Sequence, residues 1–168
     1  MTKISDVLTR IGPGKRSIES RDRTRFPSSV KRILVPTDLT IESEKAIEFG
    51  LVLARLFGAQ LTLFHVYHEP YSIEYLRGPC AYNAVLENRR YSASILNSIA
   101  EDVKKRYSDC DAEFCDGVPS EEIVRMASEQ KIDLIVVSTH HYNWLGRLAY
   151  GCDSERILRD APCPVLIL

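Results

Sequence analysis

Short apolar runs alternate along this chain with stretches in which apolar positions recur every three or four residues. The runs predict five strands, at residues 33–35, 61–66, 112–115, 132–137 and 165–168. The stretches between them predict four helices, one after the first strand and three that begin near residues 85, 120 and 151. Strands that alternate with helical crossovers predict a single α/β domain, with an open parallel five-stranded sheet and helices on both faces.

The first predicted helix has clear signals at both ends. Thr40 or Ser43 can cap its start, and Gly58 is placed to end it. Its inward face is predicted to carry Ala46, Phe49, Leu53 and Leu56. Ser120 is expected to cap the third helix in the same way. Residues 67–82 have no clear period and contain prolines and a glycine, so we expect a long loop there.

Charge divides the chain near residue 30. Residues 1–32 carry nine basic and three acidic side chains, a balance of +6, so the rest carries -7 because the total is -1. Residues 1–30 are therefore predicted to form a basic, flexible arm, and residues 31–168 the folded domain. Apolar residues at helical spacing in the arm, which could dock on the domain or on a partner, are Ile4, Val7, Leu8 and Ile11. A basic arm alone gives only unspecific attraction to nucleic acid, so we do not expect such a partner.

Composition excludes several classes of protein. No apolar run approaches the roughly 18 residues that span a bilayer, and the first eight residues lack the apolar core of a signal peptide. We therefore expect a cytoplasmic protein that does not insert in a membrane. The five cysteines include no C-x-x-C pair and no zinc-ligand spacing, which favours reduced thiols and no metal site. Sequence motifs for a nucleophile elbow, a zinc protease or a Walker loop are missing, so we expect no catalytic residues and no enzyme.

Candidate binding residues follow the strands. Ligands of open α/β sheets gather outside the carboxyl ends of the strands, where the strand order reverses. The loops expected there are residues 36–40 after the first strand, 66–68 after the second and 138–151 after the fourth. His65, at the end of a buried strand, is interpreted as a hydrogen-bonded core histidine, and the adjacent His140 and His141 as loop residues.

Six ordered motifs resemble the universal stress protein family. They are ILVPTD at 33–38, FHV at 64–66, GVPSEEI at 117–123, DLIVV at 133–137, SERIL at 154–158 and APCPVL at 161–166. The resemblance covers the chain from about residue 31 to its end. It implies an adenine-nucleotide alpha-hydrolase-like fold with strand order 3-2-1-4-5, and a homodimer that pairs the final strands of two subunits.

ATP-binding members of that family carry G-x2-G-x9-G-[ST] in the fourth loop. In this chain Ser138, His141 and Gly151 stand at the three glycine positions, and Cys152 at the serine or threonine position, so only one of four matches. The resemblance implies that nucleotide contacts, if any, fall on Pro36, Thr37, Asp38, Val66, Ser138, His141, Gly151, Cys152 and Asp153.

The departures from this motif weaken a phosphate site. Glycine lets the backbone approach phosphate closely and adopt positive φ without steric conflict. His141 adds a ring where the ligand would pass, and a strained non-glycine residue costs on the order of 1 to 3 kcal/mol. Cys152 replaces a good hydroxyl donor with a weak one. The motif is therefore degenerate, and the resemblance then implies a stress-response regulator that acts through dimerisation and partner binding.

Two alternatives stay open. The helix predicted to begin at Gly151 offers free N–H groups to an anion, and Arg147 lies just upstream, so a switch that binds ATP or AMP with Mg²⁺ in a modified pocket is the first. Asp38 is retained, either for ligand contact or as a helix cap or a link between loops. The second alternative is a thiol sensor at Cys152, because a helix N-terminus stabilises thiolate.

Overall fold

The structure is a computed structural model that describes residues 29–68, 79–138 and 153–168. Its five strands are all parallel, in the order β3-β2-β1-β4-β5. The strands are β1 (Arg32–Pro36), β2 (Gln60–Tyr67), β3 (Cys110–Asp116), β4 (Leu134–Val137) and β5 (Val165–Ile167). The helices are α1 (Ile41–Phe57), α2 (Pro79–Arg106), α3 (Pro119–Glu129) and α5 (Asp153–Asp160). The predicted fold class and strand order are confirmed.

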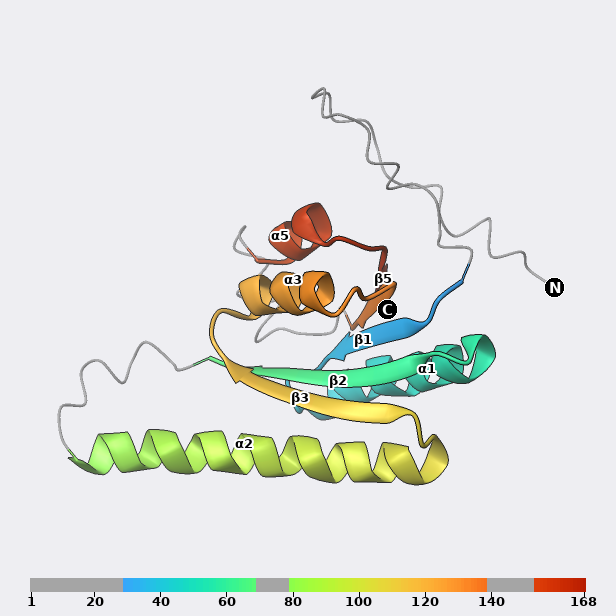
Figure 1. Cartoon of the computed structure of the whole chain (residues 1–168). Coiled ribbons are helices and arrows are strands. Elements are labelled where there is room, and N and C mark those ends of the chain that lie inside the picture. The colour runs from blue at the N-terminus through green and yellow to red at the C-terminus, as the bar shows by residue number, and fades with distance from the viewer. Residues whose placement is uncertain (1–28, 69–78, 139–152) are drawn as a thin grey trace.

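Each face of the sheet is covered by its own hydrophobic cluster. Side chains of β1 alternate between the two: Ile33 and Val35 pack with α1 and α2, whereas Leu34 packs with α3 and α5. In Figure 1, α3 and α5 lie above the sheet and α2 lies below it. All four residues of β4 are buried, which fits a parallel strand covered on both faces. Among the helices described, none combines the length and apolar composition that crossing a bilayer requires.

The predicted inward face of α1 is confirmed at Ala46 and Leu53, which belong to or pack against the core, and is wrong at Phe49 and Leu56. Phe49 is 40% exposed and Leu56 is 67% exposed. The helix instead turns toward the sheet a row of small residues one turn apart, Ala46, Gly50 and Ala54, all of them buried. A Cβ added at Gly50 would lie 2.6 Å from Cγ2 of Val35, so the helix lies too close to β1 for a larger side chain. The face of α1 with small residues therefore packs on the sheet, because it allows the closest approach. The large apolar residues Phe49 and Leu56 stay partly exposed to solvent.

Several predicted helix ends also need correction. Gly58 ends α1 as predicted, in the left-handed conformation with φ of 64°, and its N–H donates to the carbonyl of Ala54. Ser120 does not cap α3, because the helix begins at Pro119 and Val118 occupies the cap position. Proline at the first helical position fixes φ for the helix and lacks the N–H that a cap would satisfy. The second helix begins at Pro79 rather than near residue 85, and the rest of the predicted 67–82 loop lies largely outside the described residues.

Candidate functional site

The carboxyl ends of β1 and β4 lie side by side where the strand order reverses. From this pair the sheet continues to β2 and β3 on one side and to β5 on the other. The register pairs Ile33 with Leu134, so Thr37 and Ser138, each four residues further on, follow at the same edge. This is the switch point at which open α/β sheets bind ligands. The fold thus brings the predicted segment 36–38 and Ser138 to one place.

A chain of hydrogen bonds through two buried hydroxyl groups holds the loop after β1. Ser43 Oγ donates to the carbonyl of Thr40 at 2.8 Å, because a carbonyl oxygen can only accept. Ser43 Oγ must then accept from Thr37 Oγ1, which lies 2.7 Å away. Thr37 Oγ1 accepts in turn from the N–H of Leu39 at 3.0 Å. Each hydroxyl proton is used inside the loop, so neither hydroxyl has one left to donate to a ligand.

Asp38 links residues within this loop. Its Oδ1 accepts hydrogen bonds from the N–H and the Oγ1 of Thr40, at 3.1 and 2.8 Å. Such a bond from the N–H two residues on is an Asx turn, which aspartate favours. Thr40 occupies the cap position of α1 but its side chain makes no capping hydrogen bond. These bonds lie within one loop, whereas the sequence suggested a helix cap or a link between loops, and ligand contact stays a prediction.

His65 connects the second strand to the loop after the first. Its Nδ1 lies 2.8 Å from the carbonyl oxygen of Thr37, so Nδ1 carries the proton and donates. The N–H of Thr37 donates to the carbonyl of Phe64 at 2.8 Å. Burial lowers the pKa of His65 below its usual range, and the Thr37 carbonyl and Asp38 oppose this more weakly. The predicted hydrogen bond of His65 is confirmed, although the residue is half-buried rather than part of the core, and the imidazole links the candidate loop to β2.

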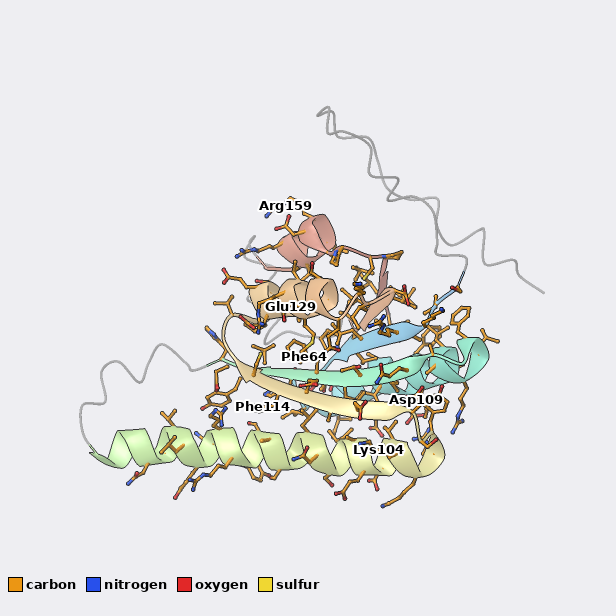
Figure 2. The ribbon with its side chains drawn as sticks, in the orientation of Figure 1. Phe64, Lys104, Asp109, Phe114, Glu129 and Arg159 are labelled. Carbon is orange, nitrogen blue, oxygen red and sulfur yellow. The ribbon has the colours of Figure 1, made fainter. Side chains whose placement is uncertain are left out.

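An aromatic and charged cluster, which the sequence did not reveal, lies beside the ends of β2 and β3. Phe114 packs near His65, with ring centroids 5.6 Å apart, and near Tyr67 at 6.5 Å. The guanidinium of Arg89 lies 5.1 Å from the Phe114 ring centroid and pairs with both carboxylate oxygens of Asp116. Figure 2 shows Phe114 on β3, beside α2. Strand pairing and helix packing bring these residues together from distant positions, and no spacing in the sequence marks them.

Of the remaining predicted site residues, two lie at the ends of β2 and β4, one begins α5, and the others lie outside the described residues. Val66 is 9% exposed and pairs with Cys115 of β3. Ser138 is 5% exposed directly after β4. Asp153 is the first residue of α5, and its side chain is not described. His141, Gly151 and Cys152 lie outside the described residues.

The thiols that the structure describes are free and protonated. Burial raises the pKa of Cys110 and Cys115 to about 11 and that of Cys163 to about 12. At Cys115 the carboxylate of Glu122 adds to this effect. The three cysteines form no disulfide. In the described ranges, no group of three histidine, cysteine or acidic residues is placed to hold a metal ion.

Comparison with known proteins agrees with this architecture. The family model described as the universal stress protein family matches residues 29–168. A Thermus aquaticus protein, named universal stress protein in QAH/OAS sulfhydrylase 3' region, is 31% identical over 144 residues, which cover 82% of this chain and 98% of that protein. The universal stress protein UspA of Lactobacillus plantarum has the same fold, with a TM-score of 0.68, 21% identity, and coverage of 84% of this chain and 99% of that one.

A third protein of this fold was solved with a ligand. It is a universal stress protein in complex with cAMP, with a TM-score of 0.63, 23% identity, and coverage of 84% of this chain and 98% of that one. The similarity to these solved structures shows the fold, whereas the family model and the Thermus relative show the family. This chain belongs to the universal stress protein family.

Proposed function

We propose that this chain is a cytoplasmic regulator of the stress response that acts by dimerisation and partner binding, with a degenerate nucleotide site. The observation that carries the proposal is Ser138, which stands where ATP-binding relatives have the first loop glycine. It is 5% exposed at the switch point, where it adds side-chain atoms that a glycine would not have. His141 and Cys152 depart from the same motif in sequence.

The loop after β1 supports the same conclusion. The hydroxyl protons of Thr37 and Ser43 are committed within the loop, and Asp38 Oδ1 already accepts two hydrogen bonds. A nucleotide that accepted a hydroxyl proton from Thr37 or Ser43 would have to replace an internal hydrogen bond, worth about 0.5–1.5 kcal/mol net. The hydroxyl of Thr37, one of the groups implied for ATP, is therefore poorly suited to donate to a nucleotide.

The proposed dimer rests on the edge of the sheet. β5 pairs only with β4 in the described part of the chain, so its other edge has backbone groups available to a second strand. Ile167 on this strand is 42% exposed. An exposed edge strand with a large apolar side chain is suited to pairing with the same strand of another subunit.

A second candidate function is an adenine-nucleotide switch that holds ATP or AMP with Mg²⁺ in a modified pocket. The observation that favours it is also at Ser138: its hydroxyl is buried, and no hydrogen bond of this hydroxyl is found within residues 29–68, 79–138 and 153–168. A buried hydroxyl gains from a polar partner, which a ligand could supply. A thiol sensor at Cys152 is a third candidate, and it predicts fast alkylation of that thiol at neutral pH.

Restoring the glycines separates the first two functions. In the degenerate-site proposal, titration calorimetry detects no ATP binding to the parent chain, and the variant Ser138→Gly with His141→Gly gains affinity. The single variants serve as controls for the contribution of each side chain. If the parent binds ATP with Mg²⁺ as tightly as the double variant, the two side chains do not block the site and the nucleotide switch is the better account.

A further inference from the structure

A groove with an apolar floor lies between α1 and α2, next to the loop that carries Asp38. Ile47 of α1 and Val103 of α2 line it and belong to the core, and Ile99 packs against them. Ile41, the first residue of α1, lines the same groove and is 83% exposed. A β-branched side chain so exposed at the border of an apolar floor offers a contact for a further apolar segment.

The border of this groove is acidic on balance, with three carboxylates against the guanidinium of Arg106. Its carboxylates are Glu44, Glu48 and Asp102. Arg106 pairs with Glu48 through two hydrogen bonds of 2.5 Å, and Lys105 pairs with Asp102 at 2.7 Å. Glu44 lies in the first turn of α1, which begins at Ile41, and makes no ion pair with any residue that the structure describes. The groove therefore suits a segment that combines apolar side chains with positive charge.

The chain contains one such segment ahead of the described residues. Residues 1–28 hold seven basic and three acidic side chains. Within them, Ile4, Val7, Leu8 and Ile11 are spaced as one face of a helix, between Lys3 and Lys15. We propose that residues 3–16 dock in the groove between α1 and α2, with the apolar face toward Ile41 and the groove floor and the lysines at the acidic border.

The attachment point of the arm makes this contact reachable. Val30, just before β1, is 2% exposed and belongs to the same cluster as Ile47 and Val103, so the chain joins the domain on the face that α1 and α2 cover. Positions 11 and 30 are nineteen residues apart in the sequence, and a random coil of that length has a root-mean-square span of about 25 Å. The whole of α1 is also about 25 Å long. A tether matched to its span gives an effective concentration in the millimolar range, which favours the arm of the same chain over that of a second copy.

Zero-length cross-linking of the full chain tests the docking. A carbodiimide joins lysine amines to carboxylates in contact, and mass spectrometry then identifies the linked residues. We expect links from Lys3 or Lys15 to Glu44 or Asp102. An equal mixture of ¹⁴N- and ¹⁵N-labelled chains distinguishes docking within one chain from docking on a second copy. Links within one chain carry a single isotope, whereas half of the links between two chains carry both. A lack of arm-to-groove links, or links that are mainly mixed, would overturn the proposal.

Matched variants show whether the apolar face is responsible. Leu8→Asp should lower the yield of these links by about tenfold, since it places a charge in the apolar contact. Thr9→Asp makes the same charge change on the opposite side of the predicted turn and should leave the yield almost unchanged. On the domain, Ile41→Ser should also lower the yield, whereas Leu158→Ser, at a half-exposed site on α5, should not. Equal effects of Leu8→Asp and Thr9→Asp would mean that charge alone attracts the arm, and the docking site would be rejected.

Discussion

The imidazole of His65 donates a hydrogen bond from Nδ1 to the carbonyl of Thr37, across a distance of 2.8 Å. The bond joins the end of β2 to the loop after β1, at the edge of the sheet where ligands of this fold bind. His65 is half-buried, and the bond requires only that Nδ1 keep its proton. The neutral ring satisfies this requirement, and burial favours the neutral ring because it lowers the pKa.

We expect stability to fall as pH decreases past the usual histidine pKa of 6.5, because the unfolded chain then takes up a proton that His65 resists in the fold. The loss should develop between 6.5 and the lower pKa of the folded state. His65→Asn keeps a donor near the Thr37 carbonyl but does not titrate. The advantage of the parent over this variant, measured by urea unfolding at pH 7.5 and at several lower values, should therefore shrink as pH falls. A difference that stays constant with pH would refute this role for His65.

The hydroxyl pair of Thr37 and Ser43 should stabilise the fold. Thr37→Val leaves the N–H of Leu39 without its acceptor and should lower the free energy of unfolding by about 1–3 kcal/mol. Thr62→Val is a matched control, because Thr62 is 3% exposed and its hydroxyl has no hydrogen bond among the described residues. This control should change stability little or increase it. Equal losses in the two variants, measured by urea unfolding, would show that the hydroxyl chain contributes nothing specific.

Gly50 should not tolerate alanine, although it lies in the interior of a helix. Replacing a helical glycine by alanine usually stabilises by about 0.5–1 kcal/mol. Here the new Cβ would meet Cγ2 of Val35 at 2.6 Å, so we expect Gly50→Ala to destabilise by about 1–3 kcal/mol. Thermal unfolding measures the change, with Val52→Ala at a 56% exposed site of α1 as the control, expected to stay within about 0.5 kcal/mol. A stabilised Gly50→Ala protein would contradict the close packing of α1 on β1.

The proposed dimer should depend on the outer edge of β5. Ile167→Asp places a charge on the exposed face of this edge strand and should convert dimer to monomer in sedimentation velocity. Leu158→Asp, at a 51% exposed position of α5, makes the same kind of change away from the edge and should leave the dimer intact. Dimers that persist in Ile167→Asp would locate the interface elsewhere.

Sequence patterns predicted the sheet well because most strands contain an apolar run, although β3 alternates apolar residues with the charged Asp111 and Glu113. The helix faces were harder to predict. Large apolar residues such as Phe49 and Leu56 suggested one face of α1, but the distance between helix and sheet is set by Gly50 and its small neighbours, which a hydrophobic pattern does not weigh. Only the three-dimensional fold shows how close two elements approach.

The candidate site was predictable in location but not in internal bonding. The motif at residues 33–38 placed Thr37 and Asp38 at the switch point, and the structure agrees. An aspartate two residues before Thr40 is a recognisable signal for an Asx turn, and could have indicated the loop link. The partnership of Thr37 with Ser43 and the cluster around Phe114 depend on side-chain directions and on contacts between distant segments, which the sequence does not encode in any local pattern.

Our central proposal is that the site at the switch point of this chain does not bind ATP in the ordinary way. Thermal melting of the parent protein with millimolar ATP and Mg²⁺ tests it most directly, because a ligand that binds the folded state raises the melting temperature. We predict a shift below about 1 °C, and a larger shift in the Ser138→Gly, His141→Gly variant. A rise of several degrees in the parent would contradict the claim and identify the chain as a nucleotide-binding switch.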